Sequence, residues 1–514
     1  MTTNKKWIAF IASFAIYLGI HSCSLDEKDL YKPVPEAIFN NAAGISNGVS
    51  GAYSMLREIY GSEPGFTATT MGTDLFQHGK DGSYKFMDDY STAFNPQNSY
   101  LAKIWNNCYI GINAANTVLD KIDLVADMDG TSKSRYKAEA RFLRAHYYYW
   151  LTLQFGDVPY SEHETKGVVT DAGRVRKDSI WQKMKDDTQF AVDNLGWTTT
   201  DYGRVTKGAA LNQLARIDLL LKDNKGAAEA ALNVINNGPY KLLSSYADVF
   251  DYNNQQNNEI IFAVQYLNNA LYNGNGNSSH ALFTPAYDQF AGLQRDLTQG
   301  GRPYTRFRPT EFFRNLFDPN DARFDVTFRY TWIYNNTKTL PAGKNIGDTV
   351  IWEISPGVTS VVAPNNDNMH WGVKKHDDPA RASVQDLDGF RDFFVYRLSD
   401  TYLLAAEALL LQGKAGDGVV WLNAVRKRAA KPGKTLPELT ADQLDMDAIL
   451  DERARELGGE EDRWMDLART GKLIERVSKY NPNAKNIKPY HILRPIPQEQ
   501  IDLSTNKFPQ NEGY

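Results

Sequence analysis

The chain has 514 residues, of which 42% are hydrophobic and 23% charged, an ordinary balance for a globular protein that buries a core. At roughly 100–200 residues per domain, this length allows two to four domains or one large helical fold. The formal net charge is −5. Because no long run of Lys or Arg occurs, the sequence argues against a surface for nucleic acid or for an anionic membrane.

The N-terminal segment has the pattern of a bacterial lipoprotein signal. Two lysines precede an apolar run at 7–20, which is shorter than the roughly 20 residues that a membrane-spanning helix needs. The run leads to Cys23, so we expect a signal peptide at 1–22, lipid attachment at Cys23 and an acidic, proline-containing tether at 23–35. The alternative is an ordinary secretory signal with a chance cysteine. If Cys23 carries lipid, the second cysteine, Cys108, has no partner, so we expect no disulfide framework.

Helical periodicity dominates both ends of the chain beyond the tether. Between 135 and 156, for example, Phe142, Ala145, Tyr149 and Leu153 keep one helical face apolar. By the same pattern, helices are predicted at 36–60, 98–122, 135–156, 206–222, 224–236, 397–412 and 417–430. Neighbouring helices with small residues at their crossings are typical of tetratricopeptide-like stacking. We therefore expect a helical scaffold built from residues 36–239 and 396–514.

The middle of the chain, residues 240–395, has a different composition. It is rich in Asn, Gly, Asp and aromatic residues, and helical periodicity is mostly lost. Short strands are predicted at 259–265 and 348–354. Loops of this length in a compact protein are usually functional or disordered, and the tryptophans embedded here argue against disorder. The predicted fold class is mainly α, a tetratricopeptide-like repeat scaffold with a large irregular insertion that contains short strands and binds ligand.

Several stretches, in order along the chain, resemble the SusD/RagB family. They are Glu139–Ala145 with Phe155–Pro159, Lys207–Leu219, Arg397–Ala408, Leu422–Ala429, Glu452–Leu467, Pro495–Asp502 and Asn511–Tyr514. The Gly458-Gly459 pair departs from the pattern, because bulkier residues are expected inside a helix. The resemblance implies a non-catalytic lipoprotein of the outer membrane that faces the cell exterior. It also implies binding of a glycan and delivery to a TonB-dependent transporter of the SusC type.

The sequence lacks the common catalytic and metal-binding patterns, which agrees with a binding role. None of the eight histidines forms a zinc motif, and no nucleophile elbow or phosphate loop occurs. The turn at 318–321 and the Asn-rich run after Asp251 do not match a calcium loop. Glu452 and Glu456 could form a hydrolase carboxylate pair, but their dense Arg neighbours favour ion pairs on an exposed helix face. We predict no catalytic residue, no cofactor and no metal.

A glycan site needs flat aromatic rings for the apolar faces of sugars and planar polar groups for the hydroxyls. The aromatic candidates are Trp371, Trp332, Trp352, Tyr304, Tyr272 and Tyr84. The polar candidates are Asp74, Asn275, Arg302 and Asn368. For each aromatic residue the alternative is a place in a local core.

Two other functions remain open from the sequence. The first is a protein-interaction scaffold in a transporter complex for a non-carbohydrate nutrient, since helical repeats often bind protein. The second is a surface hydrolase, which the missing catalytic patterns disfavour. The aromatic content does not distinguish one glycan from another.

Overall fold

The computed structural model describes residues 39–514 except 83, 270–272, 353–366 and 461. The predicted signal peptide at 1–22, the lipidated Cys23 and the tether at 23–35 lie outside the described residues. Within the described ranges, no helix combines the length and the apolar character required to cross a lipid bilayer.

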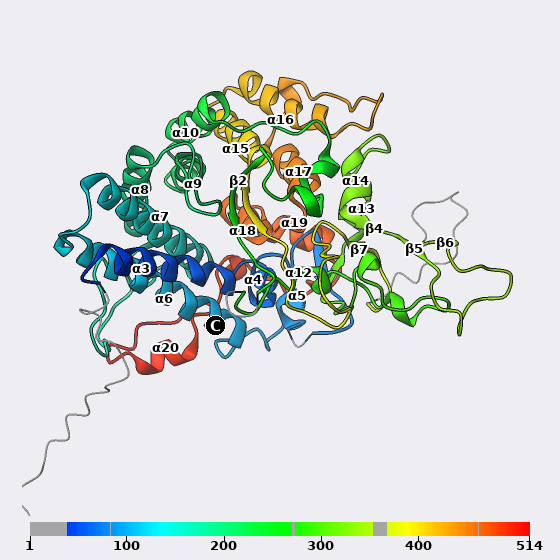
Figure 1. The fold of residues 1–514 in the computed structure, drawn as a ribbon, viewed down its shortest axis with the longest axis horizontal. Coiled ribbons are helices and arrows are strands. Elements are labelled where there is room, and N and C mark those ends of the chain that lie inside the picture. The colour runs from blue at the N-terminus through cyan, green and yellow to red at the C-terminus, as the bar shows by residue number, and fades with distance from the viewer. Residues whose placement is uncertain (1–38, 83, 270–272, 353–366, 461) are drawn as a thin grey trace, which may run out of the picture.

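Helices occupy most of the two ends of the chain (Figure 1). In the first half they are α3 (Ala42–Ser54), α4 (Glu63–Thr69), α5 (Phe86–Asp89), α6 (Ser99–Lys121), α7 (Gly130–Phe155), α8 (Lys177–Asn194), α9 (Lys207–Leu220) and α10 (Asn224–Asn237). In the middle they are α11 (Tyr246–Val249), α12 (Ser279–Leu282), α13 (Glu311–Asn315) and α14 (Ala322–Thr327). In the last part they are α15 (Leu398–Leu411), α16 (Ala415–Ala429), α17 (Met446–Leu457), α18 (Arg463–Arg469), α19 (Leu473–Tyr480) and α20 (Gln498–Leu503).

The strands are short and pair as antiparallel two-stranded sheets in the described part of the chain. They are β1 (Phe76–His78) with β3 (Phe307–Pro309), β2 (Ile260–Val264) with β8 (Phe393–Arg397), β4 (Phe328–Arg329) with β7 (Gly372–Val373), and β5 (Thr331–Ile333) with β6 (Thr349–Ile351). The pairing of β2 with β8 joins the entry and the exit of the middle segment. This pair therefore closes the insertion at its base.

The long helices stack one after another into a curved, tetratricopeptide-like arc, which Figure 1 shows from α3 and α6 through α9 to α16. The predicted helices are confirmed, most of them with shifts of one or two residues at their ends, because apolar faces and caps are local signals. The helix predicted at 36–60 corresponds to the shorter α3, and α7 begins five residues before the predicted start at 135. At the start of α6, for instance, the Asn98 side chain accepts hydrogen bonds from the N–H groups of Tyr100 and Leu101.

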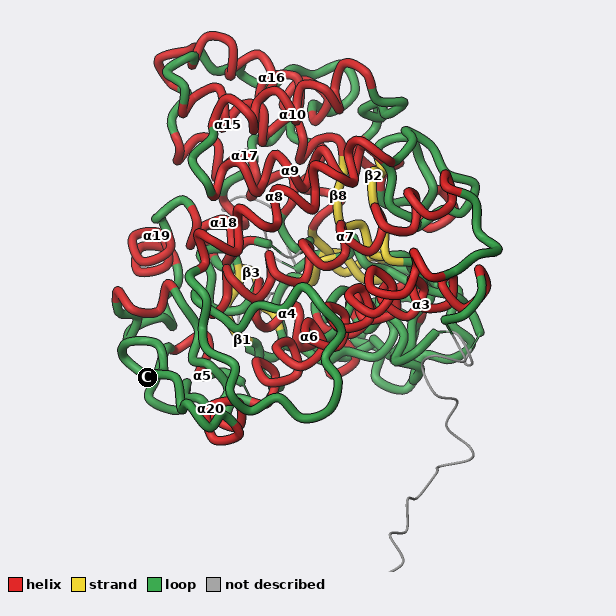
Figure 2. The backbone as a smooth tube through the Cα atoms, turned by 90° about the vertical axis from the view of Figure 1, so that its left-hand side faces the viewer, coloured by secondary structure: helices red, strands yellow, loops and turns green. Residues whose placement is uncertain are grey.

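The arc is continuous across the insertion because α10 packs directly against α15. Ala227 and Ala228 of α10 contact Ala408 and Leu409 of α15 in one buried cluster. Small side chains on both helices allow the two backbones to approach closely. Helices separated by about 160 residues of sequence therefore behave as consecutive members of the stack (Figure 2).

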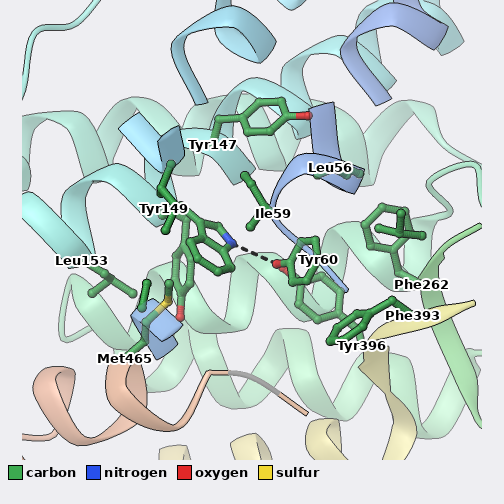
Figure 3. Packing of buried hydrophobic residues seen from close by; sticks show 14 of the residues in the cluster. Leu56, Ile59, Tyr60, Tyr147, Tyr149, Leu153, Phe262, Phe393, Tyr396 and Met465 are labelled. Atoms are coloured by element: carbon green, nitrogen blue, oxygen red, sulfur yellow. Dashed lines mark hydrogen bonds between the residues drawn. The ribbon is translucent and has the colours of Figure 1, made fainter. Parts of the chain in front are cut away.

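Aromatic residues fill the core on the inner side of the arc (Figure 3). Tyr60 meets Trp150 edge to face, with ring centroids 5.5 Å apart, and its hydroxyl accepts a hydrogen bond of 2.9 Å from the Trp150 indole. Phe393 of β8 lies against the other side of Tyr60, at 5.3 Å. The insertion and the helical scaffold thus share one hydrophobic core.

The charged residues of α17 are buried, which corrects the prediction of an exposed helix face. Glu452 and Glu456 are both fully buried. Arg323, from the insertion, lies 2.7 Å from Glu452 and 3.1 Å from Glu456. Arg428 of α16 also contacts Glu456, at 2.5 Å. The pairs join different elements rather than successive turns of one helix, so the periodicity alone could not reveal their burial.

The unusual Gly458-Gly459 pair marks the end of α17. A Cβ added to Gly458 would lie 2.3 Å from the Phe313 ring, which is too close for any side chain. Gly459 has a φ of +86°, in the region that favours glycine, and its carbonyl accepts a hydrogen bond from His376. The helix therefore stops where the insertion packs against it.

Candidate binding surface

The structure buries Trp332 and Trp352, so the prediction that they stack on a ligand is corrected. Trp332 is 1% exposed and stacks on Tyr287, with ring centroids 4.4 Å apart and an interplanar angle of 10°. Trp352 is fully buried, and its ring centroid lies 5.1 Å from that of Trp332. The described residues of the insertion form two-stranded sheets, which cannot cover a large core. The tryptophan rings supply a small local core instead.

Trp371 and Asp74 also belong to the interior rather than to a binding surface. Trp371 is 4% exposed and meets Phe324 edge to face at 5.6 Å. Asp74 is fully buried and pairs with Arg463 of α18 at 2.6 Å and with Arg476 of α19 at 2.9 Å. Both residues hold segments together that are distant in the sequence.

Two further predicted residues, Asn275 and Asn368, are at least partly accessible and are engaged by other polar side chains. The exposed Asn275 amide is 3.3 Å from a Glu58 carboxylate oxygen. Asn368 is partly buried and donates to Gln289 at 2.6 Å. The remaining prediction in this region, Tyr272, lies outside the described residues.

Two partly exposed tyrosines stack on each other where α6 begins. The ring centroids of Tyr84 and Tyr100 are 3.7 Å apart, with an interplanar angle of 24°. The Tyr84 hydroxyl is also 2.6 Å from the Ser99 hydroxyl. Because the Asn98 cap fixes the first turn of α6, Tyr100 is held in place by the backbone as well as by its neighbour.

A third partly exposed tyrosine, Tyr304, is flanked by two arginines. The guanidinium carbons of Arg302 and Arg306 lie 5.2 and 4.9 Å from the centre of the Tyr304 ring. Arg306 also pairs with Glu63 of α4 at 2.6 Å and with Asp81 at 2.8 Å. Burial alone would lower the pKa of Arg306, but these two carboxylates hold it above its ordinary value. Its side chain is therefore a fixed cation.

Glu63 connects the two groups of tyrosines. Burial raises the pKa of Tyr100, and the neighbouring Glu63 carboxylate and Tyr84 phenol raise it further. The phenol of Tyr100 thus stays protonated at neutral pH and interacts with the Glu63 carboxylate. We call Tyr84, Tyr100 and Tyr304, together with Arg302, Arg306, Glu63 and Asp81, the tyrosine surface.

Pairing of β1 with β3 brings the two sides of the tyrosine surface together. Beyond the strands, the Gly79 N–H donates to the Arg306 carbonyl at 2.9 Å, and the Asp81 N–H to the Thr305 hydroxyl at 3.3 Å. A Cβ on Gly79 would lie 2.1 Å from the Thr305 carbonyl oxygen, so this close approach requires glycine. The loop with Tyr84 and the strand after Tyr304 are adjacent for this reason.

The tyrosine surface combines the two kinds of group that sugars need. Its aromatic rings can cover the apolar face of a pyranose, and its Arg and carboxylate groups can pair with hydroxyls. Tyr84, Tyr304 and Arg302 were predicted from the sequence. The other members of the surface were not, namely Tyr100, Arg306, Glu63 and Asp81. The signal for Tyr100 was its position in the first turn of a helix with a clear Asn cap.

A separate groove of about 430 Å³ lies between α3, the loop at 201–204 and β2. Tyr53 and Tyr202 line it, together with Arg204. Its polar groups are engaged internally, since the Tyr53 hydroxyl donates to Glu139 at 2.9 Å and Arg204 pairs with Glu139 at 3.0 Å. The groove offers fewer aromatic faces than the tyrosine surface.

Neither Glu452 nor Glu456, the two carboxylates considered for hydrolysis, can serve as a general acid. Burial would raise the pKa of Glu452, but Arg323, Arg455 and Arg426 hold it at about 2. Arg428 and Arg397 likewise keep the pKa of Glu456 below its ordinary value against the effect of burial. A glycosidase needs one carboxyl group with a raised pKa, placed at a cleft. Both groups are instead permanently ionised and enclosed.

A stacked helical scaffold with an aromatic and polar surface defines a binding protein of the helical-repeat class. Comparison with known proteins agrees. Residues 249–514 match the family model described as SusD family, and residues 25–219 match one described as "Starch-binding associating with outer membrane". The chain therefore belongs to the SusD family, whose members are carbohydrate-binding proteins and not enzymes.

Individual relatives extend over most of the chain. It is 25% identical to SusD-like protein P25 of Formosa agariphila, over 93% of this chain and 94% of that protein. It is 26% identical to the starch-binding protein SusD of Bacteroides thetaiotaomicron, over 82% and 80% of the two chains. Among solved structures, a laminarin-binding SusD-like protein has a TM-score of 0.75 at 24% identity, over 92% of this chain and all of that one. The last comparison confirms the fold.

Proposed function

We propose that this protein binds an oligosaccharide or polysaccharide at the tyrosine surface, without chemical conversion. The observation that supports it most directly is that the stacked pair of Tyr84 and Tyr100 and the ring of Tyr304 meet at one ion pair. Glu63 of that pair interacts with Tyr100, and its Arg306 lies beside Tyr304. The names of relatives agree in ligand class. They include a starch-binding protein, a laminarin-binding protein and a surface glycan-binding protein A of Bacteroides thetaiotaomicron solved with laminarihexaose.

Binding would use the two groups of the surface for different parts of the sugar. The rings of Tyr84 and Tyr304 would cover pyranose faces, and each lost stack should cost on the order of 0.5–1.5 kcal/mol. Arg306 and Asp81 would pair with hydroxyl groups. Because Glu63 and Asp81 already hold Arg306, little conformational entropy would be lost on binding.

A panel of polysaccharides, including laminarin and starch, tests this proposal by titration calorimetry and by retention in affinity gels. We expect Tyr304→Ala and Tyr84→Ala each to weaken binding about twofold to tenfold, and the double variant to abolish retention. Tyr202→Ala, in the separate groove, is the matched control and should bind like the wild type. Loss of binding in Tyr202→Ala with full binding in the double variant would overturn the assignment of the surface.

We further propose that the protein is anchored in the outer membrane through lipid on Cys23 and passes its ligand to a TonB-dependent transporter of the SusC type. The outer-membrane description of the matching family supports the location. Cys23→Ser should release the protein from the membrane fraction, and co-purification from native membranes should recover the transporter. A transporter complex with no response to any glycan of the panel would favour a scaffold for a non-carbohydrate nutrient.

A further inference from the structure

Next to the tyrosine surface, three side chains capable of binding metal converge. His78 ends β1, and Asp88 and Asp89 end α5. The His78 Nε2 atom lies 3.5 Å from Asp89 Oδ1 and 3.9 Å from Asp88 Oδ2. All three potential ligand atoms fall within 4.8 Å of one another. The group is partly accessible, since the Asp89 side chain is 40% exposed.

The hydrogen bond made by Nδ1 defines the tautomer of the neutral His78 ring. Its Nδ1 atom is 3.0 Å from the Gly79 carbonyl oxygen, which can only accept. Nδ1 therefore carries the proton. In the neutral ring, Nε2 then has a free lone pair on the side of the two aspartates. Donation of the second N–H to a backbone carbonyl is the usual arrangement of a metal-binding histidine.

Asp88 is a fully buried carboxylate without an arginine or lysine partner among the described residues. Its oxygens instead accept hydrogen bonds from three neutral donors. These are the backbone N–H of His78 at 2.8 Å and the side-chain amides of Asn481 and Asn483 at 2.7 and 2.9 Å. Asp74 is equally buried but faces two arginines. The charge of Asp88 thus lacks the arginine partners that neutralise Asp74.

The spacing fits a small ion better than direct hydrogen bonds. Distances of 3.5 and 3.9 Å are long for hydrogen bonds. Ligand atoms about 2.0–2.2 Å from a tetrahedral ion are roughly 3.4 Å apart. Calcium would need six to eight oxygen ligands, whereas one imidazole with two carboxylates suits zinc. We infer that His78, Asp88 and Asp89 form a binding site for a divalent transition-metal ion of the zinc class.

An ion at this site would connect β1 to α5. These elements are the two ends of the segment that carries Asp81 and Tyr84, so the ion would fix the segment at its base. Asn481 and Asn483, which directly follow α19, donate hydrogen bonds to Asp88 and so connect this segment to a third part of the chain. The metal site stands on its own geometry and does not depend on the proposed ligand of the tyrosine surface.

Zinc titration of the tag-free, chelator-treated chain tests the inference, with calorimetry for affinity and elemental analysis after gel filtration for stoichiometry. We expect one zinc ion per chain and a higher thermal midpoint with zinc. Asp89→Asn, at a partly exposed position where folding is not at risk, should weaken binding at least tenfold. His78→Ala should abolish it.

The matched control is His163→Ala. His163 is 82% exposed and lies 2.8 Å from Asp120, so it presents a surface His–Asp pair without a third ligand. This variant should bind zinc like the wild type. The inference is overturned if the wild type takes up no zinc, if Asp89→Asn and His78→Ala bind it unchanged, or if His163→Ala loses it. Tighter binding of calcium or magnesium than of zinc would overturn the class of metal.

Discussion

Asp74 and Arg463 are 389 positions apart in the sequence and form a two-point ion pair, with Nε–Oδ1 and Nη2–Oδ2 distances of 2.8 and 2.6 Å. Arg476 approaches the same carboxylate at 2.9 Å. Burial would raise the pKa of Asp74, but the two arginines hold it below its ordinary value. The pair fastens the segment before β1 to the C-terminal helices α18 and α19.

Removal of the Asp74 charge should destabilise the fold strongly. In Asp74→Asn, Arg463 and Arg476 lose their shared counter-ion inside the protein, and a broken buried pair typically costs about 3–5 kcal/mol. Glu229→Gln is the matched control, because its partner Lys225 is 80% exposed and the pair is worth at most about 0.5 kcal/mol. Guanidinium unfolding curves measure both. Equal, small changes in the two variants would contradict a stabilising role for Asp74.

Acid should unfold the protein through the carboxylates of α17. The pKa of Glu452, about 2, lies below its unfolded value, so its contribution to stability is complete above about pH 5 and is lost as the pH falls toward 2. Glu456 changes in the same direction. We expect the denaturant midpoint to fall steeply between about pH 4.5 and 2.5. A midpoint that stays constant over this range would show that the arginine clusters contribute little.

Asp392 should behave in the opposite way. Burial raises its pKa to about 6, although the Tyr266 N–H and nearby arginines act against this. The protonated form is therefore favoured in the fold, and the stability it provides is lost as the pH rises through 6. Asp392→Asn can still accept from the Tyr266 N–H, as Oδ1 does now at 2.9 Å. At pH 8 we expect this variant to exceed the wild type by on the order of 1–3 kcal/mol, and at pH 4 to match it. Unfolding curves at both values check this.

Substitution of Trp332 should affect stability and not ligand binding. Trp332→Ala leaves a cavity beside Tyr287 and Trp352 and should cost about 3–5 kcal/mol. Trp332→Phe fills much of the space and provides a folded sample for binding assays. Its glycan retention should equal that of the wild type, whereas Tyr304→Ala should retain less and unfold almost normally. Weak glycan retention by a well-folded Trp332→Phe variant would show that Trp332 does take part in ligand binding.

The scaffold could be predicted closely because its signals are local. Helix α15 begins and ends within one residue of the predicted range 397–412, and α9 within two of 206–222. The strand predictions at 259–265 and 348–354 correspond to β2 and β6. Apolar spacing, caps and glycine breaks act over a few residues, so they are readable without knowledge of the partners.

The proposed binding surface could be predicted only in part, because exposure is a property of the assembled chain. Trp332 and Tyr304 both lie in an irregular, polar segment, and nothing in their neighbourhoods distinguishes them. The first is covered by Tyr287, while the second remains at the surface between two arginines. Only the packing of the insertion separates a buried ring from a partly exposed one.

The amino-acid sequence by itself determined the family, the helical repeats and the places where they stop, since each depends on short-range preferences and on ordered motifs. The tertiary structure alone decided which aromatic rings face solvent, which carboxylates of α17 meet arginines, and that Tyr84, Tyr100 and Tyr304 share one surface. Those relations join residues up to hundreds of positions apart. They arise from the pairing of β1 with β3 and of α10 with α15, which no local pattern encodes.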